Sequence, residues 1–356
     1  MALALRPPID PMLAKLTREL PPAGAVSYEP KWDGFRCIVF RDGDDLDLQS
    51  RNNKPLLRYF PELVAPLLAQ LPEQVVLDGE LVIANEKGLD FDALQLRQHP
   101  AASRVKKLAA EIPASYVAFD LLALGADSWC ERSFRERRAQ LETELAGVEA
   151  PIHVTPATLD RDTAEDWFHR FEGAGFDGVV AKPLDGTYRP GERTMLKVKH
   201  ERTADCVVAG YRVHKDGKGV GSLLCGLYDE AGDLHHVGVA SGMAAPLRGE
   251  LLADVQPLRE HALDDHPWRE WAEAMAHETG TRMPGGMNRW NANKDMSWEA
   301  VRIERVIEVA YEGLMAGRFR HNARFRRWRP DKDPDDCTYA QLETVAPAEL
   351  REMFAH

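Results

Sequence analysis

The spacing of apolar residues in the first 200 positions predicts an α+β unit. Short runs of β-branched and aromatic residues predict strands at 27–31, 35–41, 74–84, 116–122 and 177–182. Helical patterns are expected at 61–71, 133–144 and 163–172, the second capped by Ser133. The Asp33-Gly34 turn separates the first two strands, so Lys31 is expected to project from a strand end into a cleft.

The pattern changes near residues 200–204, where short strands begin to alternate with Gly-rich turns. Strands are expected at 205–213, 222–229, 234–239, 305–312 and 324–329. Five such strands predict a small β-barrel, with a Gly- and Lys-rich hairpin tip at 215–221. A helical insertion is expected at 263–277 and an ordered loop at 278–298. We therefore predict two domains, 1–202 and 203–356, joined by a hinge.

Composition narrows the class of protein. A chain of 356 residues with 44% hydrophobic content can bury one large core or two moderate ones. The net charge of −12 excludes whole-chain attraction to a polyanion, so nucleic acid would have to bind at local basic patches. Five scattered cysteines without a Cys-x-x-Cys pair argue against a zinc site and a disulfide framework. With no signal peptide and no apolar run of about 18 residues, the expected location is the cytoplasm, with no membrane span.

Lys31 and the later pair Lys197 and Lys199 are the candidate chemical groups. A lysine amine attacks phosphorus only when it is neutral, and an unperturbed pKa of about 10.4 leaves it almost fully protonated at neutral pH. Burial or neighbouring cations disfavour the ammonium form. A phosphate pocket lined by further lysines would therefore activate Lys31 and also bind the triphosphate that it attacks.

Lys31 belongs to the first of six short motifs that follow one another in a fixed order. The motifs are Glu29-Pro30-Lys31-Trp32-Asp33-Gly34-Phe35-Arg36, Ser50-Arg51, Leu77-Asp78-Gly79-Glu80-Leu81, Val117-Ala118-Phe119-Asp120-Leu121-Leu122, Asp177-Gly178-Val179-Val180-Ala181-Lys182 and Met195-Leu196-Lys197-Val198-Lys199. One Lys-x-Asp-Gly string arises by chance, but six ordered motifs are specific. The set resembles the nucleotide-pocket motifs of the covalent nucleotidyltransferases, which include DNA ligases, RNA ligases and mRNA capping enzymes. The resemblance implies an adenylation domain of mixed and antiparallel sheets and helices, followed by an OB-fold barrel.

The same resemblance implies a role for each matching residue. Lys31 is the nucleophile that becomes linked to AMP. The other implied catalytic residues are Asp33, Glu80, Lys197 and Lys199. The implied nucleotide contacts are Glu29, Arg36, Arg51, Phe119 stacked on the purine and Lys182 at the α-phosphate. The implied ligands of Mg²⁺ or Mn²⁺ are Glu80 and Asp177, although most of the family carries Glu at the second position.

Each of these residues also has an ordinary structural explanation. In isolation, Glu80 is a strand-end carboxylate, Phe119 a core aromatic and Lys182 a surface lysine with a buried stem. Arg36 and Arg51 in isolation are solvent-facing charges, whereas planar guanidinium forks also suit phosphate or ribose contacts. The order of the motifs, more than any single residue, favours the functional interpretation.

Six arginines are interleaved with aromatic residues in the segment 318–329. On a strand, alternation places arginines on one face and rings on the core side, as a phosphate-contacting barrel edge requires. A solvated strand with an apolar underside is the alternative explanation. Arg329, Asp331 and Lys332 resemble the C-terminal Arg-x-Asp-Lys motif of ligases and capping enzymes. In those families the motif swings over the nucleotide and orients the leaving pyrophosphate.

Two longer phrases, Arg189-Pro190-Gly191-Glu192-Arg193 and Trp328-Arg329-Pro330-Asp331-Lys332, resemble the ATP-dependent DNA ligases of the short bacterial LigC and LigD repair type. The resemblance implies three steps: Lys31 attacks ATP, AMP passes to the 5′-phosphate of a nick, and the 3′-hydroxyl displaces AMP. ATP is the expected donor, because the sequence lacks the nicotinamide domain and four-cysteine module of NAD-dependent ligases. The expected form is a monomer. Its expected partners are nicked or broken duplex DNA, the end-binding protein Ku and a separate repair primase-polymerase.

Two alternatives stay open at this point. An RNA ligase or capping-type nucleotidyltransferase would share Lys31, Glu80 and the lysine pair, and would differ in its donor and its nucleic acid. A non-catalytic nucleic-acid-binding protein with a relic pocket is disfavoured, because Lys31 and every phosphate-facing lysine are present.

Overall fold

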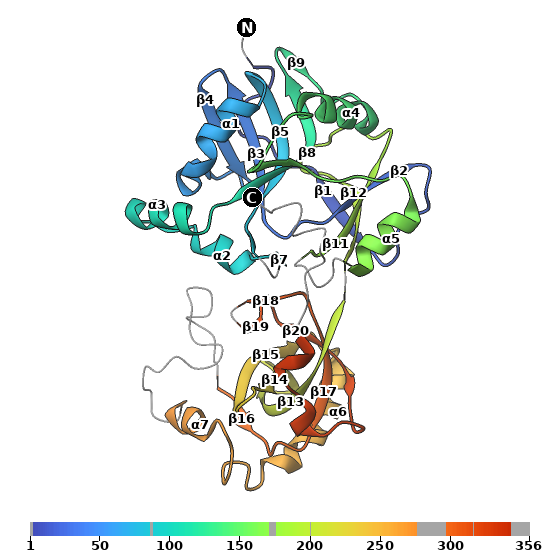
Figure 1. The fold of residues 1–356 in the computed structure, drawn as a ribbon. Coiled ribbons are helices and arrows are strands. Elements are labelled where there is room, and N and C mark those ends of the chain that lie inside the picture. The colour runs from blue at the N-terminus through green and yellow to red at the C-terminus, as the bar shows by residue number, and fades with distance from the viewer. Residues whose placement is uncertain are drawn as a thin grey trace. The chain divides into compact units, whose positions relative to one another are not determined.

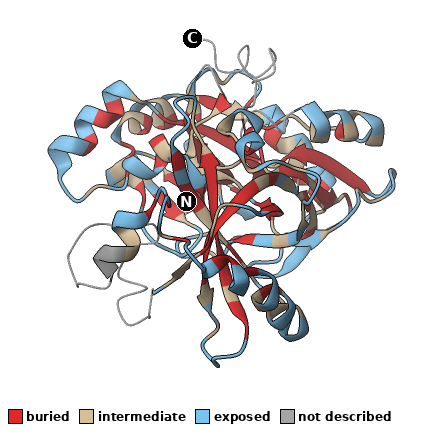
Figure 2. Ribbon diagram, turned by 90° about the horizontal axis from the view of Figure 1, so that it is seen from below, coloured by how far each residue is buried: buried red, intermediate tan, exposed pale blue. Residues whose placement is uncertain are grey.

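A computed structural model describes residues 3–85, 88–170, 176–199, 201–275, 297–315 and 317–342. These residues fall into two compact units, one ending at Lys199 and the other running from Glu201 to Leu342. Figure 1 shows the helices and strands of both units. Figure 2 shows that buried residues are concentrated in the strands and that the helices carry much of the exposed surface.

Two sheets form the first unit. The four-stranded sheet has the order β1 (Leu13–Thr17), β12 (Arg193–Lys199), β11 (Gly178–Pro183) and β2 (Val26–Pro30). The six-stranded sheet has the order β10 (Ile152–Val154), β8 (Ser115–Leu124), β5 (Gln74–Val82), β3 (Phe35–Asp42) and β4 (Asp45–Ser50), with β9 (Asp127–Ser128) paired to β8. A small ribbon joins β6 (Ala84–Asn85) and β7 (Gly88–Leu89). All five strands predicted in this region are confirmed.

The two strands that flank the Asp33-Gly34 turn do not pair with each other. β2 pairs with β11 in the smaller sheet, whereas β3 pairs with β4 and β5 in the larger one. The turn therefore carries the chain from one sheet to the other. A Cβ atom on Gly34 would lie 2.1 Å from the carbonyl oxygen of Leu81, so only glycine fits at this crossing.

The helices cover the outer faces of the sheets. They are α1 (Val64–Gln70), α2 (Phe91–Leu96), α3 (Ala102–Glu111), α4 (Phe134–Glu144) and α5 (Arg161–Arg170), with 3-10 turns at Leu57–Tyr59 and Pro61–Leu63. The predicted cap of α4 is confirmed, because Ser133 and Glu136 form a reciprocal capping box. Helix α5 begins before its predicted start at residue 163, because the Asp160 carboxylate accepts hydrogen bonds from two backbone amides of the first turn. Its predicted end lies outside the described residues.

The second unit is a closed five-stranded barrel. Its strands are β13 (Arg202–Val213), β14 (Val220–Tyr228), β15 (Leu234–Ser241), β20 (Ala323–Trp328) and β17 (Val306–Tyr311). The order is β14-β15-β20-β17-β13, and β13 pairs back to β14 to close the ring. The β15–β20 pair is parallel and the other pairs are antiparallel. This topology is that of an OB-fold, as predicted.

The second unit also contains shorter helices and strands outside the five barrel strands. They are α6 (Ala245–Val255), α7 (Arg269–Met275), β16 (Glu299–Ala300), β18 (Leu314–Met315), β19 (Arg318–Phe319) and 3-10 turns at Gln256–Arg259, Pro334–Asp336 and Tyr339–Leu342. The predicted helix at 263–277 is too long at its start, because Pro267 disfavours a helical conformation at the residue before it. Helix α6 was not predicted. Most of the expected loop at 278–298 lies outside the described residues. None of the helices in the described ranges is long and apolar enough to cross a membrane.

Candidate active site

The candidate lysines lie on one face of the four-stranded sheet. Across β2, β11 and β12, the register places Glu29 opposite Val180 and Val180 opposite Lys197. Gly178 lies opposite Lys199, and its carbonyl accepts the backbone N–H of Lys31 at 2.8 Å. Because side chains alternate along a strand and paired positions share a face, these groups point to the same side. Lys182 belongs to the same face, since it is two positions beyond Val180.

The opposite face of this sheet is apolar. Val26, Tyr28, Val179 and Ala181 pack there against Ala164 of helix α5. This packing fixes which way the strands face, because a slip of one residue would bury lysines against α5. The hydrophobic core on one side of the sheet therefore presents the lysines on the other side.

Lys31 and Lys199 share one carboxylate. The Lys31 Nζ lies 2.7 Å from Asp177 Oδ2, and the Lys199 Nζ lies 3.3 Å from the same oxygen. Burial alone would raise the pKa of Asp177, but the two lysines lower it below its usual value. Asp177 is held in place by its backbone, whose N–H donates to the Lys31 carbonyl at 3.0 Å. The structure thus brings three of the predicted site residues into direct contact.

Lys197 lies among like charges. Partial burial lowers the pKa of its ammonium, and Lys199, Lys31 and Arg51 lower it further. Arg51 is exposed directly after β4, so its charge reaches this cluster from the larger sheet. A concentration of cations on one sheet face is what a triphosphate needs for binding.

Glu29 and Lys182 form a buried ion pair at the other end of the same face. The Lys182 Nζ donates to Glu29 Oε2 at 2.7 Å and to the carbonyl of Phe119 at 2.8 Å. Burial raises the pKa of Glu29 and lowers that of Lys182, against the mutual attraction of the pair. Arg138 lies 3.6 Å from Glu29 Oε1, an oxygen that has no hydrogen-bond partner among the described residues. The structure places Lys182 beside Glu29 and Phe119, and its implied contact with the α-phosphate stays a prediction.

Phe119 occupies a β-bulge. The pairing of β8 with β5 passes from Ala118–Gly79 to Asp120–Asp78 and skips Phe119. A bulge re-aims one side chain without disturbing the rest of the strand. The Phe119 ring lies 4.4 Å from the Arg36 guanidinium and 4.6 Å from the Lys182 Nζ, measured to the ring centroid.

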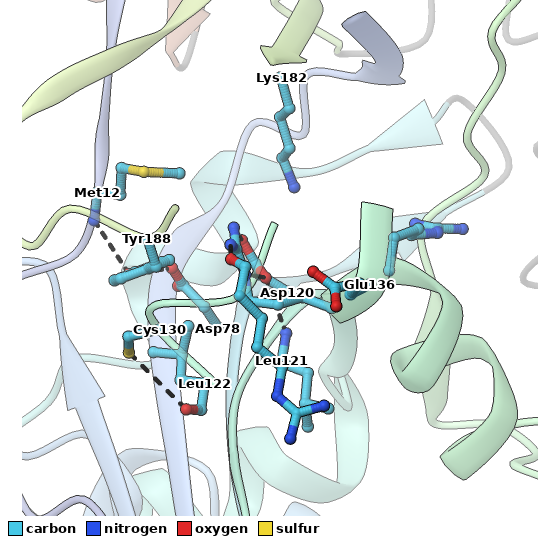
Figure 3. Close-up of polar contacts among 12 residues, drawn as sticks. Met12, Asp78, Asp120, Leu121, Leu122, Cys130, Glu136, Lys182 and Tyr188 are labelled. Atoms are coloured by element: carbon cyan, nitrogen blue, oxygen red, sulfur yellow. Dashed lines mark hydrogen bonds and ion pairs between the residues drawn. The ribbon is translucent and has the colours of Figure 1, made fainter. Parts of the chain in front are cut away.

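The guanidinium fork of Arg36 is already paired inside the protein. Its Nε and Nη2 donate to the two carboxylate oxygens of Asp78, each at 2.5 Å. Asp78 is fully buried and also accepts the hydroxyl of Tyr188 at 2.6 Å (Figure 3). The bidentate edge of Arg36 is therefore used inside the protein, and a phosphate or ribose contact would have to use its remaining nitrogen.

Glu80 lies beside Arg36 in the register of β5 and β3. Burial raises the pKa of Glu80 to about 7, with smaller contributions from Asp33 and Asp78. Arg36 and Lys31 oppose this increase. Glu80 thus shares the electrostatic environment of Lys31 and Asp33, although they come from different strands and a turn.

The raised pKa of Glu80 has a measurable effect on stability. The carboxyl holds its proton more tightly in the folded protein than in the unfolded chain, so stability is lost as pH rises from about 4.5 through about 7. We expect Glu80→Gln to raise the melting temperature by about 5 °C at pH 8 and by much less at pH 5. Calorimetry without nucleotide would measure the difference. Glu73→Gln, an exposed carboxylate before the same strand, is the control, and an equal gain at both pH values would contradict the prediction.

The predicted closing motif lies in the second unit. Arg329 Nη1 lies 2.8 and 2.9 Å from the two carboxylate oxygens of Asp205, and its Nη2 lies 2.8 Å from Asp331. Lys332 Nζ lies 3.3 Å from Asp205. Hydrogen bonding to Arg329 lowers the pKa of Asp331 to about 2.

The arginine-rich strand β20 differs from a simple alternation. Its pairing with β17 passes from Arg327–Glu308 to Phe325–Val309, so Arg326 is the extra residue of a bulge. The bulge lets Phe325 and Trp328, which are three positions apart, both pack against the barrel core. Arg324 and Arg326 pair with Glu201, and Arg327 pairs with Glu308 at 2.8 Å. Several of these arginines are thus exposed but partly neutralised.

Sequence reasoning missed four groups that shape the site. Asp78 belongs to the Leu77–Leu81 motif of an apolar strand, and a carboxylate in such a strand indicates that a buried cation or donor pairs with it. Tyr188 and Arg138 carry no local signal, because their partners are far away along the chain. Arg137 is buried against Asp120 with an Nε–Oδ1 distance of 2.7 Å, and fixes the residue that follows Phe119.

No group of three or more His, Cys, Asp or Glu side chains arranged to hold a metal ion occurs among the described residues. Magnesium is usually held by one or two carboxylates together with phosphate oxygens and water. Asp177 and Glu80 fit an ion that arrives with the triphosphate better than one in a closed protein cage.

Comparison with known proteins agrees with this geometry. Residues 11–199 match the family "ATP dependent DNA ligase domain", and residues 216–332 match "ATP dependent DNA ligase C terminal region". The chain is 55% identical to DNA ligase C2 of Mycolicibacterium smegmatis, covering 97% of each protein. It is 54% identical to DNA ligase C of Mycobacterium tuberculosis, covering 99% of each. A solved structure from a study of Lig E DNA ligases covers 89% of this chain and 99% of its own, with 17% identity and a TM-score of 0.53, and supports the fold alone.

The two-sheet unit with its lysine-lined face and the OB-fold barrel match the architecture that the sequence motifs predict for a covalent nucleotidyltransferase. Within that class, the family matches and the relatives of near-equal length are decisive. The chain belongs to the ATP-dependent DNA ligases.

Proposed function

We propose that this ligase seals nicks and breaks in duplex DNA through an adenylate carried on Lys31. The observation that carries the proposal is the contact of Lys31 and Lys199 with one Asp177 oxygen, on the sheet face that also holds Lys197. A nucleophilic amine, a carboxylate that orients it and cations for the phosphates are the parts that the first step needs.

In that step the neutral Lys31 amine attacks the α-phosphorus of ATP. A nitrogen–phosphorus bond forms, the bond from the α-phosphorus to the oxygen that bridges the α- and β-phosphates breaks, and pyrophosphate leaves while the amine gives up one proton. Lys197 and Lys199 would stabilise the charge that grows on the phosphates. A magnesium or manganese ion, with Asp177 and Glu80 as its protein ligands, would screen the triphosphate. AMP then passes to the 5′-phosphate of the DNA, and the 3′-hydroxyl displaces it.

The buried end of the face supports ATP as the donor. Within the part of the chain that the structure describes, Glu29 Oε1 lacks a hydrogen-bond partner, and a carboxylate oxygen would accept a hydrogen bond from the exocyclic amine of adenine. The same oxygen would repel the carbonyl that guanine carries at that position. Phe119 would stack on the base, while Lys182 and Arg138 keep Glu29 in place.

A role in repair is supported by more distant relatives. The chain is 29% identical to the Mycobacterium bovis "Multifunctional non-homologous end joining protein LigD", over 87% of this chain and 37% of that protein. We infer that this ligase acts in DNA repair in the cytoplasm, as a monomer. Ku and a separate primase-polymerase are the proposed partners.

Labelled donor and a denaturing gel test the proposal directly. The protein is incubated with labelled ATP, GTP or NAD and then with nicked DNA or nicked RNA. Label should move from ATP to the protein and then to DNA. Labelling by GTP, or joining of RNA without DNA, would instead support a capping-type enzyme or an RNA ligase.

The barrel arginines provide a second test. If Arg326 and Arg327 contact phosphates, replacing both with Ala should lower the slope of log affinity against log salt by about 1 to 2. Fluorescence anisotropy with nicked duplex DNA at several salt concentrations would measure the slope. Arg302→Ala, which removes an arginine paired with Glu304 outside β20, is the control. An unchanged slope would favour the solvated-strand explanation.

A further inference from the structure

The cations of the Arg-x-Asp-Lys motif are already occupied by carboxylates of the barrel. All three guanidinium nitrogens of Arg329 are engaged: Nη1 by Asp205, and Nε and Nη2 by Asp331 at 2.9 and 2.8 Å. Lys332 shares Asp205 at 3.3 Å. Glu308 adds a third carboxylate, 3.9 Å from Arg329 Nη1. The residues that are expected to act on phosphates therefore face protein anions in this structure.

Asp205 is the residue that joins the two cations. It lies on β13 directly opposite Glu308 of β17 and is largely buried, with 13% of its side chain exposed. Gln341 holds its backbone on both sides, because its Oε1 accepts the Asp205 N–H at 2.8 Å and its Nε2 donates to the Asp205 carbonyl at 3.0 Å. The carboxylate is therefore fixed by the barrel and does not follow the motif if the motif moves.

Asp331 differs from Asp205 in this respect. It is two residues from Arg329 and belongs to the same turn, closed by the Lys332 N–H donating to the Arg329 carbonyl at 3.2 Å. A displacement of the motif would carry Asp331 with it but would break both contacts to Asp205. Among the anions around the motif, Asp205 is the one that anchors both Arg329 and Lys332 to the barrel.

A phosphate oxygen and a carboxylate oxygen compete for the same N–H donors. Arg329 and Lys332 cannot give full hydrogen bonding to pyrophosphate while they serve Asp205. We propose that Asp205 is a positioning residue that holds Arg329 and Lys332 on the barrel, so that nucleotide phosphates must displace its carboxylate before the motif acts in enzyme adenylation. This inference rests on the proposed function, because it assigns the motif to the adenylation step.

The proposal predicts an unusual gain of function. Asp205→Asn keeps the size of the side chain and one acceptor oxygen but removes the competing charge. At limiting ATP, we expect the lysine adenylate to form about fivefold faster in the variant. Because the reverse reaction uses the same contacts, pyrophosphate should discharge the adenylate at about fivefold lower concentration. Sealing of a pre-adenylated nick, which releases no pyrophosphate, should change by less than about twofold.

Four variants are compared in rapid-quench assays with the full-length protein. Asp205→Glu restores the charge and should behave nearly as the wild type. Glu308→Gln should give a smaller gain, because its carboxylate lies farther from Arg329. Glu250→Gln on the exposed surface of α6 removes one charge from the barrel without touching the motif, and should have no effect.

The outcomes separate this inference from the proposed function. If the wild type forms no lysine adenylate, the proposed function fails and this inference fails with it. If the wild type is adenylated but a folded Asp205→Asn variant is adenylated at an equal or lower rate, only the inference is overturned. Thermal unfolding of each variant distinguishes a slow enzyme from a misfolded one.

Discussion

Lys31→Ala is expected to abolish the covalent adenylate and with it all sealing that starts from ATP. The Lys31 amine is the one that contacts Asp177 at 2.7 Å, on the same sheet face as Lys197 and Lys199. The neighbouring lysines bind phosphates in our proposal but do not replace the nucleophile. Loss of a covalent nucleophile removes the first intermediate, so the residual rate should lie at least about 10⁴-fold below the wild type. Mass spectrometry after incubation with ATP would detect the added adenylyl group.

Two further variants test whether the lost activity of Lys31→Ala comes from the missing amine or from the missing charge. Lys31→Arg keeps a positive charge beside Asp177, but a guanidinium stays protonated in proteins, so this variant should be as inactive as Lys31→Ala. Lys15→Ala is the matched control, because Lys15 is an exposed lysine of the same sheet, in a register position that faces away from Lys197. Both inactive variants should still seal a pre-adenylated nick. Adenylyl mass on either Lys31 variant would show that another side chain is the nucleophile.

The order of motifs along the sequence anticipated much of the fold. Short apolar runs predict the strands that carry Glu29 and Lys182, but not β12, which carries Lys199. Alternation along a strand then determines which residues share a face. All five barrel strands are predicted as well, because β-branched, aromatic or alternating residues are bounded by turn residues in each case. Local patterns succeeded where a strand or a helix cap depends on nearby residues, as for the Ser133 capping box.

Contacts between distant segments were not accessible in this way. Asp78 is contacted by Arg36 and by the hydroxyl of Tyr188. Both partners also contact the backbone of Met12, which lies 176 positions before Tyr188. Nothing local in the sequence reports such pairing. The bulge at Phe119 is likewise a property of two strands together, because it exists only in the register of β8 against β5.

The same limit applies to the protein partners of Lys182 and Arg329. The role of Lys182 at the α-phosphate stays a prediction, and only the fold shows that its ammonium also contacts Glu29 and the Phe119 carbonyl. Arg329 was assigned to a closing motif from its sequence neighbours alone. Its partner Asp205 lies 124 positions earlier, on the first strand of the barrel. Roles that depend on what a cation is paired with require the structure.

Lys332→Ala is expected to slow enzyme adenylation by about 100-fold, the usual effect of removing one group that stabilises developing charge. Sealing of a pre-adenylated nick should change by less than about threefold, because that step releases AMP and not pyrophosphate. Lys332 is partly exposed, and Asp205 is the ion-pair partner that the structure gives it, so its loss should leave the barrel folded. Lys332→Arg, which keeps the charge, should recover part of the rate.

Single-turnover assays of the two steps measure this separation, with Lys218→Ala as a charge-matched control from the exposed tip between β13 and β14. A larger loss in sealing than in adenylation would show that the motif acts on DNA and not on the leaving group. Combining Lys332→Ala with Asp205→Asn adds a thermodynamic cycle. If Asp205 acts partly by holding Lys332, the increase in adenylation rate caused by Asp205→Asn should be smaller when Lys332 is absent. The increase that remains would measure the part of the effect that acts through Arg329. A gain that is the same in both backgrounds would assign the whole effect of Asp205 to Arg329.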